Sequence, residues 1–187
     1  YGLGQGLDYE PDLEIQKWLF NKDFRIALSQ AFDRQRINEV VFLGLGKNKQ
    51  PTYLKGHPFY PGEEYETKFT NQDIAEANRI LDSIGLDKKD SDGFRLRKDG
   101  SGERLTFRHL SELGPSADLM ELQTDYFADV GIEIKNKPMN APWTLSYPGK
   151  EYLAMLKGHF AYYGANPWFS GWSRCCSVGG GPAFTPD

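Results

Sequence analysis

The second half of the chain alternates strand-like and helix-like segments, and this order restricts the possible folds more than any other feature. Strand patterns occur in "LTFRHL" (residues 105 to 110), "IEIKNKP" (132 to 138) and "HFAYYG" (159 to 164). Helical patterns separate them at residues 116 to 131 and 152 to 157. The order strand, helix, strand, helix, strand is typical of crossover connections. It predicts an α/β fold with a mainly parallel sheet flanked by helices.

Three amphipathic helices are expected in the first half. Their apolar residues recur at helical spacing and are predicted to be buried: Phe24, Ala27, Leu28, Ala31 and Phe32 in the first; Ile37, Val40 and Val41 in the second; Ile74, Ala77, Leu81 and Ile84 in the third. Asp33 is suited to cap the second helix, which Gly44 would end, and Asn71 to begin the third, which Gly85 would end. We expect the first two helices to pack together, and the glycine-rich residues 1 to 22 to be a flexible linker.

Size and charge exclude several classes of protein. A chain of 187 residues is most simply one domain that can bury a core without disulfides or metals. The net charge is -4 and the basic residues are scattered, so nucleic acid is not an expected partner. The longest apolar run, "VVFLGL", is far shorter than a membrane-spanning helix, and no signal-peptide pattern is present. We therefore expect a soluble chain from which any targeting segment has been removed.

No motif for a cofactor, a metal or catalysis is complete. In "DKKDSDGFRLRKDG", Asp90 and Asp92 fit two positions of a calcium loop, but Lys88 falls on the first ligand position. The same residues suit a turn before a strand at 94 to 97, with a partner strand at 105 to 110. The three histidines lack metal-ligand spacing, and no G-x-S-x-G elbow occurs. We expect no cofactor and no enzyme activity, with a hydrolase as the weakest alternative.

Several segments resemble one protein family in the same order along the chain. "DFRIALSQAFDRQRINEVVFLGLG" is similar to a signature of the family 5 extracellular solute-binding proteins, the peptide-binding type that serves ABC importers. The similarity continues through "DIAEANRILDSIGLDKKDSDGFRLRKDG", "ERLTFRHL" and "ELQTDYFADVGIEIKNKPM". Together these segments cover residues 23 to 139, and their combination is more specific than any single one.

The resemblance implies one lobe of a two-lobed protein that closes on a solute. It implies a fold like the lobes of type II periplasmic binding proteins, with a mixed, mainly parallel sheet. Residues 23 to 178 would form the second lobe, and residues 179 to 187 would return toward the missing first lobe. The expected partners are a peptide or oligosaccharide, the permease subunits and that first lobe. The expected location is periplasmic or extracellular, with a lipid anchor as an option.

The resemblance also gives a function to "NPWFSGWSRCCSVGGG", which directly follows the last predicted strand. In parallel sheets ligands bind outside the carboxyl ends of the strands, and aromatic rings offer rigid faces to an elongated polar solute. The candidate residues are an aromatic wall and two polar contacts: Tyr162, Tyr163, Trp168 and Trp172, with Asn166 and Arg174. Alternatively, these rings fill the core, contact the other lobe or bind a protein partner.

Two further features of this segment bear on the ligand. Peptide-binding members usually carry an Asp shortly after this strand for the peptide amino group, but residues 160 to 186 contain no acid. An oligosaccharide therefore fits at least as well as a peptide. Adjacent Cys175 and Cys176 can close only a strained ring, and an unpaired thiol is unusual in an exported protein. We hypothesise a vicinal disulfide here; the alternative is that one cysteine pairs with the absent lobe.

Overall fold

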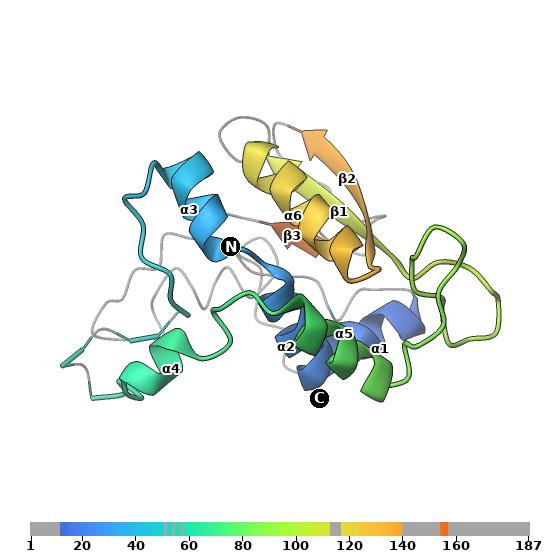
Figure 1. The fold of residues 1–187 in the computed structure, drawn as a ribbon, viewed down its shortest axis with the longest axis horizontal. Coiled ribbons are helices and arrows are strands. Elements are labelled where there is room, and N and C mark those ends of the chain that lie inside the picture. The colour runs from blue at the N-terminus through green and yellow to red at the C-terminus, as the bar shows by residue number, and fades with distance from the viewer. Residues whose placement is uncertain are drawn as a thin grey trace, which may run out of the picture.

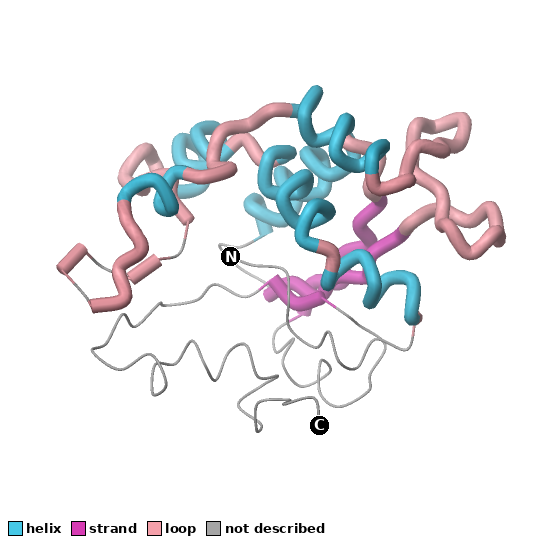
Figure 2. Tube along the Cα trace, turned by 90° about the horizontal axis from the view of Figure 1, so that it is seen from below, coloured by secondary structure: helices cyan, strands magenta, loops and turns pink. Residues whose placement is uncertain are grey.

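The computed structural model describes residues 12–50, 52–53, 55–56, 58–112, 117–139 and 154–156. Its elements in chain order are α1 (Leu13–Phe20), α2 (Lys22–Ala31), α3 (Arg34–Phe42), α4 (Glu63–Thr67), α5 (Ile74–Ser83), β1 (Thr106–Glu112), α6 (Ala117–Asp129), β2 (Glu133–Met139) and β3 (Ala154–Leu156). The helix α4 and the turns of residues 87–104 lie at opposite ends of this fold (Figures 1 and 2). Among the described helices, none is long and apolar enough to cross a membrane.

The sheet has the strand order β2-β1-β3, and both described pairings are parallel. Along β1 and β2 the register runs from Thr106 opposite Glu133 to Glu112 opposite Met139. The predicted strands at 105 to 110 and 132 to 138 are thereby confirmed, as is the helix between them, which ends before Gly131 at a positive φ of 79°. An antiparallel strand, which would make the sheet mixed, remains a prediction.

Two strand and helix predictions were wrong. Residues 152 to 157 were expected to be helical, but Ala154–Leu156 is the strand β3, paired with His109–Ser111 of β1. A place beside a central strand outweighs the weak local preference of three residues. The expected hairpin between residues 94 to 97 and 105 to 110 is reduced to an isolated antiparallel bridge from Leu96 to Arg104 with two flanking backbone hydrogen bonds, from Arg97 to Glu103 and from Leu105 to Arg95. The strand β1 itself has parallel neighbours, β2 and β3. The last predicted strand, at 159 to 164, lies outside the described residues.

Side-chain caps begin the helices close to the predicted positions. The Asn21 side chain accepts a hydrogen bond from the Phe24 amide at the start of α2 (2.9 Å). Asp73, rather than Asn71, caps α5 by accepting from the Glu76 amide (2.9 Å), while Asp33 caps α3 as expected. The helices α2 and α5 pack together, and the Asp73 amide donates to the carbonyl of Gln30 in α2 (2.9 Å).

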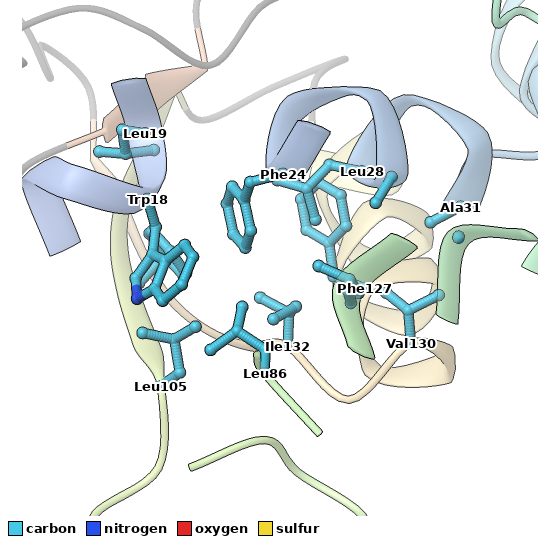
Figure 3. Packing of buried hydrophobic residues seen from close by; sticks show 14 of the residues in the cluster. Trp18, Leu19, Phe24, Leu28, Ala31, Leu86, Leu105, Phe127, Val130 and Ile132 are labelled. Atoms are coloured by element: carbon cyan, nitrogen blue, oxygen red, sulfur yellow. The ribbon is translucent and has the colours of Figure 1, made fainter. Parts of the chain in front are cut away.

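One hydrophobic core joins the helices to the sheet (Figure 3). Its buried residues are Ile15, Trp18, Leu19, Phe24, Ala27, Leu28, Ala31, Ala77, Leu81, Leu86, Leu105, Phe107, Phe127, Val130 and Ile132. Phe24 of α2 stacks on Phe107 of β1 with ring centroids 5.5 Å apart. The predicted apolar faces of α2 and α5 are therefore confirmed at their central positions.

Residues 13–20, expected to be part of a flexible linker, form α1 and belong to this core. Trp18 of α1 is 1% exposed and lies 6.0 Å from the Phe24 ring. The Glu14 carboxylate accepts hydrogen bonds from the backbone amides of Lys98 (2.5 Å) and Asp99 (3.0 Å). The helix is thus fixed by a turn more than 80 residues away, a contact that no local pattern could indicate.

The α3 helix departs from its predicted packing. None of its side chains is fully buried, although Val40 and Val41 were expected to face a partner. Val40 is 41% exposed. The predicted helix is therefore confirmed in its residues, but the apolar face that defined it is not covered within the described part of the chain.

Arg95 is a fully buried side chain that joins three segments. Its Nε donates to the carbonyl of Val130 at the end of α6 (2.8 Å), and its Nη2 donates to Oδ1 of Asn78 in α5 (2.6 Å). Its Nη1 donates to Oδ1 of Asp82 (2.5 Å) and to the carbonyl of Leu86. A buried guanidinium is tolerated only when its donors are satisfied, and here backbone and side-chain oxygens do so.

Candidate functional site

The carboxyl ends of the three described strands meet at one edge of the sheet. The register places Glu112 of β1 opposite Met139 of β2, and Ser111 of β1 opposite Leu156 of β3. This is the edge at which α/β sheets bind ligands. In the sequence, the predicted aromatic wall follows β3.

The predicted site residues themselves lie outside the described residues. This applies to every member of the wall, to the polar contacts and to the cysteine pair: Tyr162, Tyr163, Asn166, Trp168, Trp172, Arg174, Cys175 and Cys176. Whether they converge on a solute therefore remains a prediction.

A polar hollow of about 820 Å³ opens at the opposite, amino edge of the sheet. Thr106 and Glu133, the first residues of β1 and β2, form part of its wall. The other lining residues come from α1, the turns and β2: Asp12, Ile15, Asp90, Arg97, Gly102, Glu103, Arg104 and Lys135.

Arg104 holds one side of this hollow together. Its guanidinium donates to the carboxylates of Asp90 and Asp92 and to Oε1 of Glu133 (3.2 Å). It also lies over the Phe94 ring, with Cζ 4.7 Å from the centroid. Burial raises the pKa of Asp90, but hydrogen bonds from the Phe94 amide and from Arg104 lower it by more. The pKa of Asp90 therefore lies below its ordinary value. The two aspartates considered for calcium are therefore paired with a protein cation.

Arg97 closes the other side in the same way. It donates to both carboxylate oxygens of Asp12 (2.5 and 2.9 Å) and to Oδ2 of Asp99 (2.6 Å). Asp12 in turn caps α1 by accepting from the amides of Glu14 (3.1 Å) and Ile15 (3.3 Å). The hydrogen bond from Arg97 and these amides lower the pKa of Asp12, although burial opposes them.

The charged residues that line the hollow connect the start of α1, the turns and β2, and this structural role explains them better than a binding site does. Both arginines are held by acidic side chains from α1, the turns and β2, and Lys135 pairs with Glu133 (3.5 Å). A ligand would have to displace these charge-assisted bonds. In the part of the chain that the structure describes, no group of three or more His, Cys, Asp or Glu side chains could hold a metal ion.

Sequence reasoning missed these arginines because their partners are distant in the chain. Arg97 reaches Asp12 across 85 residues, and Arg95 reaches Val130 across 35. The run "FRLRKDG" gave a partial signal, because Arg95 and Arg97 alternate with apolar residues and strand geometry would place both cations on the same face. It did not indicate which of them is buried.

Solved structures share this fold. The oligopeptide-binding protein OppA is 26% identical, with a TM-score of 0.70, and the match covers 82% of this chain and 25% of OppA. AppA from Bacillus subtilis, solved in complex with a nonapeptide, is 21% identical with a TM-score of 0.65; the match covers 89% and 32% of the two chains. MelB from Agrobacterium fabrum, solved with stachyose, is 20% identical with a TM-score of 0.63, covering 86% and 26%. The expected α/β fold of a periplasmic binding protein is confirmed, and the chain spans about a quarter to a third of each neighbour.

A comparison with curated proteins found no match. A family model described as "Bacterial extracellular solute-binding proteins, family 5 Middle" matches residues 4–181, which is nearly the whole chain. The resemblance noted for residues 23 to 139 thus extends across the predicted aromatic wall. The chain belongs to the family 5 bacterial extracellular solute-binding proteins.

Proposed function

We propose that this chain is the second lobe of an extracytoplasmic solute-binding protein that captures a peptide or an oligosaccharide and delivers it to an ABC permease. The observation that carries the proposal is the family match over residues 4–181, which includes every predicted site residue. The shared fold with OppA supports it.

The proposal assigns the solute to a cleft between this lobe and a first lobe. Each solved neighbour contains two to three times as many residues beyond the matched part as within it, since the match covers 25% to 32% of its length. The carboxyl edge of the sheet would face that cleft, with Trp168 and Trp172 as the stacking surfaces. Enclosure between two lobes buries more of the solute than half a cleft can, so the complete protein is the form that binds.

Two classes of solute follow from different observations. OppA and AppA are peptide binders by their names, whereas MelB was solved in complex with stachyose. Residues 160 to 186 contain no carboxylate to pair with a peptide amino group, which favours a neutral polyhydroxyl ligand. Trp faces suit the C–H surfaces of such a ligand.

The test is tryptophan fluorescence of the complete two-lobed protein, titrated first with pools of short peptides and then with pools of oligosaccharides. We expect a saturable change with one pool that is lost in Trp168→Ala and in Trp172→Ala. Trp143→Phe is the matched control, because Trp143 is not assigned to the wall; it should respond like the parent. Binding that survives in both wall variants would refute the site while leaving the function.

Binding without turnover separates this function from the alternatives. A hydrolase would release product from one of the pools, and a protein-interaction module would bind the permease or a receptor but no small solute. Both the family and the solved neighbours consist of binding proteins. The family is extracellular by its description, and we propose the same location here. Membrane fractionation distinguishes a free protein from one attached through a lipid anchor.

A further inference from the structure

The end of α3 displays four apolar side chains to solvent. We call residues 40–46 the hook. Leu43 and Leu45 are 80% and 86% exposed, and Val40 and Phe42 are each 41% exposed. Single exposed apolar residues are ordinary on protein surfaces, but four within six residues of the chain make this segment a candidate contact site.

Hydrogen bonds hold the hook in one conformation. The side-chain amide of Asn38 accepts from the Gly46 amide (2.7 Å) and donates to the Gly46 carbonyl (3.1 Å). The Gly44 amide donates to the Asn38 carbonyl, and the Leu45 amide to that of Phe42 (both 2.9 Å). A Cβ at residue 46 would lie 2.6 Å from Oδ1 of Asn38, so a larger residue would displace the Asn38 side chain from these hydrogen bonds.

The backbone of the hook adopts a conformation that leucine rarely takes. Leu43 has φ 52° and ψ 30°, which is the left-handed region, and Gly44 follows with φ 76°. A β-carbon makes this region unfavourable, so surrounding contacts must compensate for it. The fold therefore presents Leu43 and Leu45 on a turn of defined conformation.

The chemistry of the hook is that of a permanent contact. Residues 40–46 contain no charged side chain; the next charge is Lys47. Permanent interfaces resemble a divided core, whereas transient docking surfaces are more polar. Figure 1 shows α3 at the side of the described fold away from α1, where other parts of a longer polypeptide could cover it.

We propose that the hook packs against the first lobe and helps to fix the resting position of the two lobes. This inference rests on the proposed function, because it requires the two-lobed protein. The solved neighbours continue well beyond the matched part, which supplies enough polypeptide to cover this surface. Leu43 and Leu45 would enter an apolar recess of that lobe.

The test measures how fast a thiol in the hook reacts with a maleimide dye. Leu45→Cys is placed in a Cys175→Ser, Cys176→Ser background, both in the 187-residue chain and in the complete protein. Ser91→Cys is the matched control, because Ser91 is exposed in a turn at residues 87–104, outside the hook. Leu43→Cys provides a second probe at the same surface.

We expect both leucine replacements to react as fast as Ser91→Cys in the 187-residue chain and to slow by about tenfold or more in the complete protein, because a covered thiol reacts only through local opening. Equal rates in the two proteins would overturn the inference. Slow, concentration-dependent labelling of the 187-residue chain would also overturn it, because a second copy would then be covering the hook.

The solute titration of the unmodified complete protein separates the two proposals. Protection of the hook without any saturable solute response would leave the lobe contact in place and remove the proposed function. A saturable solute response with an unprotected hook would support the proposed function and remove the lobe contact.

Discussion

Replacing Arg95 with Met is expected to destabilise the chain more than any exposed arginine replacement. Arg95 is fully buried and donates to oxygens of Val130, Leu86, Asn78 and Asp82. Methionine preserves much of the aliphatic packing but donates no hydrogen bond. The variant therefore isolates the contribution of the guanidinium from that of side-chain volume.

The magnitude follows from which acceptors can be rehydrated. The Asp82 side chain is 52% exposed and can be solvated after the change, so its loss contributes little. The carbonyls of Val130 and Leu86 are bonded in buried positions, and an acceptor left unsatisfied costs about 1–3 kcal/mol. Allowing a similar loss at Asn78, which is only partly buried, we expect a decrease in the free energy of unfolding of about 3–5 kcal/mol.

Urea unfolding of the 187-residue chain, followed by far-UV circular dichroism, measures this decrease. With a denaturant dependence of about 2 kcal/mol per molar urea, the midpoint should fall by roughly 1.5–2.5 M. Arg79→Met is the matched control: the Arg79 side chain is 68% exposed, and its ion pair among the described residues is with Glu76 of the same helix. Its midpoint should move far less.

A shift for Arg95→Met no larger than that for Arg79→Met would refute the reasoning, because the buried acceptors would then have found other partners. A large shift with an unchanged denaturant dependence would locate the effect in the folded state.

Two further predictions concern the turns around the core. The pKa of Asp12 is lowered in the folded protein, so its pairing with Arg97 stabilises the fold fully at pH values above the ordinary pKa of 3.8. This stabilisation is lost as the pH falls through the lower, folded pKa. Acid titrations of unfolding should therefore show a smaller loss of stability below about pH 4 in Asp12→Asn than in the parent. Gly131→Ala should lower the thermal midpoint strongly, because residue 131 has φ 79° and a Cβ there would lie 2.7 Å from the Gly93 carbonyl oxygen. Gly93→Ala, with a similar φ of 89° but no atom within 4 Å of its Cβ, is the control, and an equal effect of the two would show that steric contact is unimportant.

Elements with strong local signals could be predicted from the sequence. The faces of α2 and α5 follow from apolar residues spaced at 3.6 per turn. The cap of α3 by Asp33 was also predictable, whereas the capping side chains of α2 and α5, Asn21 and Asp73, were not identified. The strands β1 and β2 were recognisable from their residue types and from the helix between them. The family was recognisable because several such segments occur in its order.

The candidate site was reached only by this kind of inference. Its residues follow the last predicted strand, and the expectation rests on the general location of ligands in parallel sheets. The parallel pairing of the described strands brings their carboxyl ends together at the edge where such a site would lie. The convergence of Trp168, Trp172 and Arg174 on one solute stays a prediction.

The sequence by itself determined the helices α2, α3, α5 and α6, the strands β1 and β2 and their order, because periodic burial, capping and turn formation act between residues a few positions apart. Only the tertiary structure decided that residues 13–20 join the core, that Ala154–Leu156 is a strand, and that Arg95 is buried. Each of these outcomes depends on partners far away in the chain, such as the β1 edge for β3 and the Val130 carbonyl for Arg95. Such partners are chosen by the packing of the whole fold, which no local pattern contains.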